Sequence, residues 1–217
     1  MSSQKSQGFG QDYWDRLYHT PGHVDGCGNA AEHAAYLRAL FYLEMAHVDS
    51  IADFGFGLGR MLVAMTHAFK PSRVLGIEPS TVAFAQFDAN ELHVGQHQLR
   101  NTDLLSWCQQ SPDAFTFFDL GICSSVLQYL SDDELSDVIP VLAHRLKWLY
   151  LTVPTTDEYT KMDQQSGFHD PYAIARSVDH YRQLLAPHFE FVSSRLLESR
   201  RLGGLQASPF TEAVFRH

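Results

Sequence analysis

The chain has 217 residues, of which 45% are hydrophobic and 19% charged, so it suits one well-buried domain and is short for two. Its net charge of −9 repels phosphate backbones, and nucleic acid is therefore not expected as a partner. No apolar run approaches the roughly 20 residues that span a bilayer, and the polar start lacks the apolar core of a signal peptide. The three cysteines lie far apart, which favours neither a disulfide framework nor a zinc site. We expect a cytoplasmic protein that binds no membrane.

Residues 1–29 are predicted to form an N-terminal arm. Aromatic residues, among them Trp14 and Tyr18, have the spacing of one face of a short helix. A glycine-rich stretch that carries His19 and His23 follows. Two interpretations stay open, namely a terminal helix that packs on the core and a lid that closes over a ligand.

The main domain is predicted over residues 30–217, and it begins with a helix over 30–47. The stretch 50–60 then has the pattern of a strand, a tight turn and a helix. Glycine adopts positive φ and lets a ligand approach bare backbone, while the N–H groups at a helix start suit a carboxylate or a hydroxyl. The dinucleotide fingerprint G-x-G-x-x-G would need a glycine where Arg60 stands. The three glycines of this turn are Gly55, Gly57 and Gly59.

A second strand over 73–78 ends in Glu78, which lies 19 residues after Gly59. An acid at the tip of this strand can accept hydrogen bonds from both hydroxyls of a ribose. The alternative is a solvated carboxylate at a strand end. A helix over about 82–92, ended by Gly95, follows.

A third strand over 98–101 leads to Asp103, which either caps the next helix or accepts a hydrogen bond from a ligand. The apolar run of 115–125 is typical of a strand buried on both faces. Its last residues, Cys123 and Ser124 with the serine after them, would lie at the carboxyl end of the sheet, where open α/β sheets bind ligands.

The remaining elements are predicted from caps, prolines and apolar runs. A polar loop over 154–170 is expected to overhang the ligand pocket at the carboxyl end of the sheet. The basic cluster Arg195, Arg200 and Arg201 is interpreted as a solvated hairpin. The predicted elements are a helix from the capping box Ser131–Glu134 to about Arg145 with Pro140 inside, a strand over 148–153, a polar loop over 154–170, a helix over 170–185 that starts at Asp170 and Pro171, and two final strands over 189–192 and 210–215.

This order of elements, with Asp53 before the glycine turn and Glu78 after it, resembles the class I S-adenosylmethionine (SAM) dependent methyltransferases. The resemblance implies an α/β fold with a single Rossmann-like, doubly wound, seven-stranded sheet, helices on both faces and the last strand antiparallel. It also implies SAM as cofactor and S-adenosylhomocysteine (SAH) as product. The residues that it would place at the cofactor are Trp14, Tyr18, Asp53, Gly55, Phe56, Gly57, Gly59, Glu78, Pro79, Asp103, Leu104, Cys123 and Ser124.

The resemblance further implies that a methyl group passes to an O, N or S nucleophile of a small molecule, by in-line displacement without a metal. A base is needed only if the nucleophile must lose a proton, and His19, His23 and His169 are candidates because their segments are expected near the pocket mouth. No metal-binding spacing of side chains stands out. Phe56 departs from the small residue that the family often has, and no catalytic acid is recognisable.

Two alternatives stay open. One is an NAD-dependent oxidoreductase, against which Arg60 counts. The other is a module that binds SAM without catalysis. The sequence makes no prediction of the oligomeric state.

Overall fold

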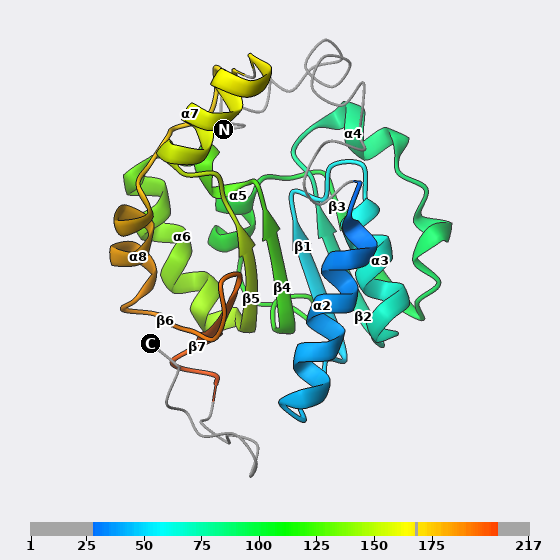
Figure 1. The fold of residues 1–217 in the computed structure, drawn as a ribbon. Coiled ribbons are helices and arrows are strands. Elements are labelled where there is room, and N and C mark those ends of the chain that lie inside the picture. The colour runs from blue at the N-terminus through cyan, green and yellow to red at the C-terminus, as the bar shows by residue number, and fades with distance from the viewer. Residues whose placement is uncertain (1–27, 168, 204–217) are drawn as a thin grey trace.

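The structure, a computed structural model, describes residues 28–167 and 169–203. Figure 1 shows a central sheet with helices packed on both of its faces. The helices are α2 (Ala30–Leu43), α3 (Arg60–Phe69), α4 (Thr81–Gln86), α5 (Leu104–Gln109), α6 (Asp132–Arg145), α7 (Thr156–Ser166) and α8 (Val178–Leu185), with short 3₁₀ helices at Ala89–Leu92 and Leu127–Tyr129. The strands are β1 (Ser50–Phe54), β2 (Arg73–Ile77), β3 (Gln96–Arg100), β4 (Phe118–Ser124), β5 (Leu146–Thr152), β6 (Phe189–Phe191) and β7 (Leu196–Ser199).

The sheet formed by these residues has seven strands in the order β3-β2-β1-β4-β5-β7-β6. The first five strands of the chain pair in parallel, whereas β7 is antiparallel to both β5 and β6. The predicted sheet with an antiparallel end is confirmed. After β1 the chain adds β2 and then β3 on one side of it, and then returns to place β4 on the other side. The strand order therefore reverses between β1 and β4. Ligands bind at the carboxyl ends of the strands beside such a point.

The two faces of the sheet carry separate apolar clusters. On one face, α5, α6 and α8 pack against side chains such as Phe54 and Leu149. On the other face, α2 and α3 cover side chains such as Ile51 and Ile122. Neighbouring strand residues alternate between the two clusters, as the two-residue period of a strand requires. The doubly wound arrangement predicted from the sequence is confirmed.

The polar stretch after β5 is a helix, so the prediction of a loop over 154–170 was wrong. Thr155 caps α7 in a capping box, in which its N–H donates to the Glu158 carboxylate at 2.8 Å. Gly167 ends the helix at φ +64°. The helix lacks the apolar stripe that marks a core-facing helix, and none of its described side chains is fully buried.

The last helix begins later than Asp170. The Asp170 carboxylate accepts hydrogen bonds from the Tyr129 hydroxyl at 2.7 Å and from the Tyr172 N–H at 3.0 Å. It therefore anchors a turn, and Ser177 caps α8 instead, by accepting from the N–H of His180. The sequence Asp-Pro occurs both in turns and at helix starts, so it does not by itself distinguish the two.

The antiparallel partner of β6 in the described residues lies earlier in the chain than the predicted strand. Strand β6 pairs with β7, whose Leu196 and Leu197 are buried between β5 and β6. The stretch 210–215, which was predicted to be this strand, lies outside the described residues. The predicted helix over 82–92 is broken at Phe87, where the backbone is extended. None of the described helices has both the length and the apolar character needed to cross a membrane.

Candidate functional site

The glycine turn joins the buried strand β1 to helix α3 and has the predicted backbone geometry. Gly55, Gly57 and Gly59 have φ values of +77°, +54° and +76°, in the left-handed region that side chains disfavour. The N–H of Gly55 donates to the carbonyl of Ile77 at the end of β2, at 2.7 Å. This bond ties the turn to the neighbouring strand tip.

Two of the glycines make room for neighbouring side chains. A Cβ on Gly55 would lie 2.7 Å from the Val126 side chain, and one on Gly59 would lie 2.1 Å from the Phe87 ring. Val126 and Phe87 therefore cover part of the turn. A ligand at this turn would therefore meet bare backbone only where Val126 and Phe87 leave the turn uncovered.

Glu78 follows β2 and closes against the turn. Its two carboxylate oxygens accept hydrogen bonds from the N–H groups of Gly57 and Ser80, both at 2.8 Å. The residue is only 4% exposed, and burial raises its pKa, against the opposing effect of the two N–H donors. The alternative of a solvated carboxylate at a strand end is therefore excluded.

Asp53, in β1, is buried beside this acid. Its Oδ2 atom has no hydrogen-bond partner among the described residues. Burial first, and the charge of Glu78 second, raise the pKa of Asp53 to about 8. Two acids close together with little water favour a ligand that carries positive charge.

No protein-family model and no curated protein matches the sequence, but solved structures resemble the chain. Magnesium protoporphyrin IX methyltransferase from Synechocystis, with bound SAH, is 17% identical with a TM-score of 0.60, over 92% of this chain and 99% of that chain. A SAM-dependent methyltransferase from Clostridium acetobutylicum is 13% identical with a TM-score of 0.63, over 89% and 97% of the two chains. The plantazolicin methyltransferase BpumL, in complex with a monoazolic desmethylPZN analog and SAH, is 15% identical with a TM-score of 0.63, over 86% and 74%.

The chain has the fold of the SAM-dependent methyltransferases. The shared fold also occurs in the small RNA methyltransferase HEN1, which is 14% identical with a TM-score of 0.61. There the match covers 78% of this chain but 25% of that one. The methyltransferase fold is thus common to proteins that act on unlike molecules.

Within this methyltransferase fold, Asp103 caps α5. Its carboxylate accepts from the N–H of Ser106 at 2.7 Å and from the Ser106 hydroxyl at 2.9 Å. Of the two interpretations of Asp103, the structure therefore supports the cap. The side chain is half-buried, and a carboxylate has acceptor sites for a ligand besides these two bonds.

Several predicted cofactor residues belong to the core instead of a cavity surface. The Phe56 ring packs on the rings of Phe84 and Phe87, with centroids 6.0 and 5.1 Å away, and is 5% exposed. Leu104 and Cys123 are buried in the apolar cluster on the opposite face. Their side chains pack the core, and the N–H and carbonyl of Phe56 already bond the Ile77 carbonyl and the Gly59 N–H.

The other predicted residues divide into surface positions and positions that the structure does not describe. Pro79 and Ser124 are half-buried at strand tips, and the Ser124 hydroxyl hydrogen-bonds that of Thr152 at 2.8 Å. His169 is exposed between α7 and α8. Outside the described residues lie Trp14, Tyr18, His19 and His23.

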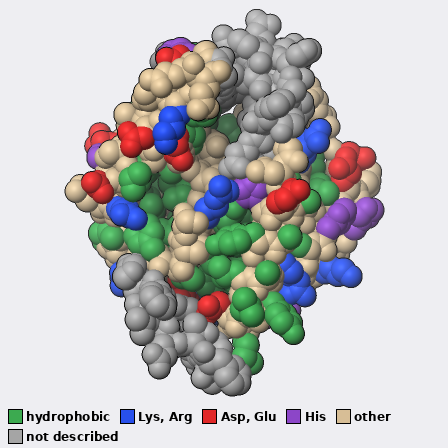
Figure 2. All heavy atoms as spheres, in the orientation of Figure 1, with side chains coloured by type: hydrophobic (Ala, Val, Ile, Leu, Met, Phe, Trp, Pro, Cys, Tyr) green, Lys and Arg blue, Asp and Glu red, His purple; other side chains and the backbone are tan. Residues whose placement is uncertain are grey.

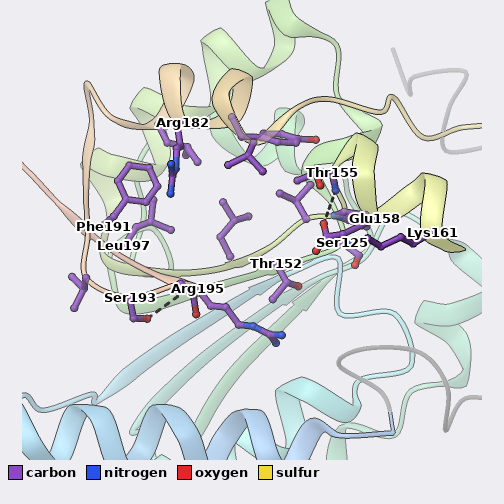
Figure 3. Close-up of a pocket in the computed structure, with 18 of the residues that line it drawn as sticks. Ser125, Thr152, Thr155, Glu158, Lys161, Arg182, Phe191, Ser193, Arg195 and Leu197 are labelled. Carbon is purple, nitrogen blue, oxygen red and sulfur yellow. Dashed lines mark hydrogen bonds between the residues drawn. The ribbon is translucent and has the colours of Figure 1, made fainter. Parts of the chain in front are cut away.

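A cavity of about 780 Å³, here called the hairpin pocket, has Thr155 and Glu158 of the polar stretch among its lining residues, as expected, whereas its walls from α8 and the β6–β7 hairpin were not predicted. It lies where β5, α7, α8 and the β6–β7 hairpin meet, and Figure 3 shows the side chains around it. Ser125, at φ +56°, and Thr152 line it at the carboxyl ends of β4 and β5. A residue other than glycine with positive φ is uncommon and often marks a functional position.

Proposed function

We propose that the protein transfers the methyl group of SAM to an O, N or S nucleophile of a small molecule. The observation that carries this proposal is the pair of buried acids at the glycine turn, Asp53 and Glu78. SAM bears a sulfonium and an ammonium group against one carboxylate, so its net charge is positive. A cation of this kind compensates two carboxylates whose pKa values burial has raised.

The residues present fit this cofactor. The partnerless Oδ2 of Asp53 is a buried acceptor, and such atoms in folded proteins call for a donor. An ammonium group donates three hydrogen bonds. Glu78, held by the N–H groups of Gly57 and Ser80, presents its remaining acceptor sites to the hydroxyls of a ribose.

Once bound, the cofactor supplies a methyl group already activated on a sulfonium sulfur, so the protein has mainly to align the acceptor and exclude water. The carboxyl ends of β4 and β5 suit this task, because Ser125 and Thr152 at these ends lie between the acid pair and the hairpin pocket. His169 remains our prediction for a base in the described residues.

A small molecule is the favoured acceptor class because of size and charge. The hairpin pocket, at about 780 Å³, lies within the 300–1,000 Å³ range that is usual for small-molecule sites. The net charge of −9 disfavours a nucleic acid such as the RNA on which the name of HEN1 indicates that it acts.

Isothermal titration of the full chain with SAM, SAH and NAD tests this proposal. We expect micromolar binding of SAM and SAH and none of NAD, because the NAD pyrophosphate would meet the two acids. Asp137→Asn, which removes an exposed acid on α6, is the matched control for changes at Asp53 or Glu78. Binding of NAD in place of SAM would contradict the proposal, whereas SAM binding with no SAH formed on any acceptor would support the non-catalytic alternative.

A further inference from the structure

The hairpin pocket has apolar walls. Leu151, Leu185 and Leu197 line it from β5, α8 and β7, with Phe191 from β6. Figure 2, in the orientation of Figure 1, shows hydrophobic side chains in the hollow on this face, with Lys and Arg side chains beside it. Such walls suit the apolar body of a small molecule.

Three cations surround these walls, each from a different element. Lys161 belongs to α7, Arg182 to α8 and Arg195 to the hairpin. The single acid among the described lining residues is Glu158, which accepts the N–H of Thr155 in the cap of α7. The chain as a whole has 25 acidic and 16 basic residues, so an excess of cations in one pocket runs against its composition.

Two of the cations have no partner that would neutralise them. The side chains of Lys161 and Arg182 make no hydrogen bond or ion pair with the described residues. Figure 3 shows Arg182 reaching into the pocket from α8 and Arg195 extending from the opposite side, toward Thr152. Lys161 lies beside Glu158 at the edge.

Arg195 is held in position by a buried histidine. Its Nη1 lies 3.2 Å from Nδ1 and 3.5 Å from Nε2 of His33, so the guanidinium packs against the imidazole, whose Nδ1 is hydrogen-bonded with the Tyr150 hydroxyl. His33 is 4% exposed and Tyr150 is fully buried. An arginine fixed from behind in this way loses little freedom when it binds an anion, which favours affinity.

The pocket opens at the sheet end that holds the acid pair. Strand β4 pairs with β1 on one side, where Ile122 lies beside Asp53, and with β5 on the other, where Ser124 lies beside Thr152. A molecule anchored at Arg182 therefore extends along these strand tips toward the glycine turn.

We propose that the methyl acceptor is a small molecule with an anionic group, a carboxylate or a phosphate, on an apolar body. Arg182 binds the anion, the leucine walls hold the body, and Arg195 adds positive charge from the opposite side of the pocket. Guanidinium groups pair with carboxylates and phosphates through two parallel hydrogen bonds, which gives both strength and orientation. This inference rests on the proposed function, because it names the substrate of the same site.

The test measures binding of matched probes to the full chain in the presence of saturating SAH, by isothermal titration. The carboxylates are octanoate and 3-phenylpropionate, the phosphates are octyl phosphate and phenyl phosphate, and the neutral controls are octanamide and 3-phenylpropanamide. We expect the anions of at least one class to bind tenfold or more tightly than the amides. The comparison of carboxylates with phosphates identifies which anion the pocket prefers.

Arg182→Gln should weaken anion binding about tenfold or more and Arg195→Gln by a smaller factor, while Arg38→Gln, an exposed arginine on α2 outside the hairpin pocket, should not weaken it. The Arg182 side chain makes no hydrogen bond with the described residues, so its replacement should leave folding unchanged. The Arg182 variant therefore remains informative even if loss of the Arg195–His33 contact disturbs folding in the Arg195 variant. SAH affinity should be the same in all three variants. Equal binding of amides and anions, no binding of any anion, or normal binding in the Arg182 variant would overturn the inference. Failure of wild-type protein to bind SAH would instead contradict the proposed function.

Discussion

Replacing Asp53 by asparagine should stabilise the ligand-free protein and at the same time weaken SAM binding. Burial raises the pKa of Asp53 from 3.8 to about 8, so its contribution to stability is fully present below about pH 4 and is lost as the pH rises through about 8. Taken at face value, the shift corresponds to roughly 5 kcal/mol at pH 8. Water entry and small movements relieve most of such a penalty, so we expect a gain of about 1–3 kcal/mol.

Urea unfolding of wild type and Asp53→Asn at pH 5 and pH 8 measures this gain. The asparagine variant should be more stable at pH 8, and the difference between the two proteins should shrink at pH 5. Titration with SAM at pH 8 should show weaker binding, because a neutral amide no longer compensates the ammonium group. The control Asp137→Asn should change neither quantity. A stability difference that is the same at both pH values, together with unchanged SAM affinity, would refute the assignment of Asp53 as an uncompensated buried acid.

Three further substitutions test other parts of the structure. Glu78→Gln places an amide N–H₂ against one of the two N–H donors at 2.8 Å, and should weaken SAM binding by about 1.5–3 kcal/mol in a calorimetric titration; unchanged affinity would argue against its contact with the ribose. Gly59→Ala puts a side chain at φ +76° and against the Phe87 ring, so thermal unfolding should show a loss of about 1–3 kcal/mol, and wild-type stability would mean that the turn relaxes freely. Arg176→Met removes the bonds to Asp132 and to the Leu130 carbonyl, and should cost about 1–3 kcal/mol in urea, whereas Arg182→Met as control should cost little.

The elements that the sequence predicted well are those determined by local chemistry. Three glycines at alternate positions indicate a turn with positive φ, because other residues disfavour that conformation. The capping box at Ser131 predicted the start of α6 for a similar reason, since the cap and the helix are a few residues apart. The apolar runs of β1 and β4 reflect burial on both faces, as is usual for interior strands of a parallel sheet, whereas the edge strand β3 is partly exposed.

The elements that differ from the prediction do so for different reasons. Helix α7 has no apolar stripe, although its Thr155 and Glu158 form the same capping box that located α6, and this signal was available. Asp170 had the sequence of a helix cap but is used by Tyr129, 41 residues away. The choice of Leu196–Ser199 as the antiparallel strand was decided by packing between β5 and β6, which no local pattern encodes.

For the candidate site, the sequence located the cofactor side better than the acceptor side. Asp53 lies near the end of β1 and Glu78 directly follows β2, so both can be found by spacing. The interpretation of the basic cluster as a solvated hairpin holds for Arg200 and Arg201, which bind the surface residues Glu190 and His144. It fails for Arg195, which is half-buried against His33, a residue 162 positions away in the chain. Such a pair is invisible to any search for short motifs.

The exposed character of α7 has a consequence for how this protein can change. Its described side chains contribute to one wall of the hairpin pocket, yet none of them is fully buried, so the sheet and both apolar clusters do not depend on their identity. Replacement of residues along this helix, outside the capping box, should therefore alter which molecules are accepted while folding yield stays constant. Libraries confined to α7 offer a route to new acceptors on an unchanged framework.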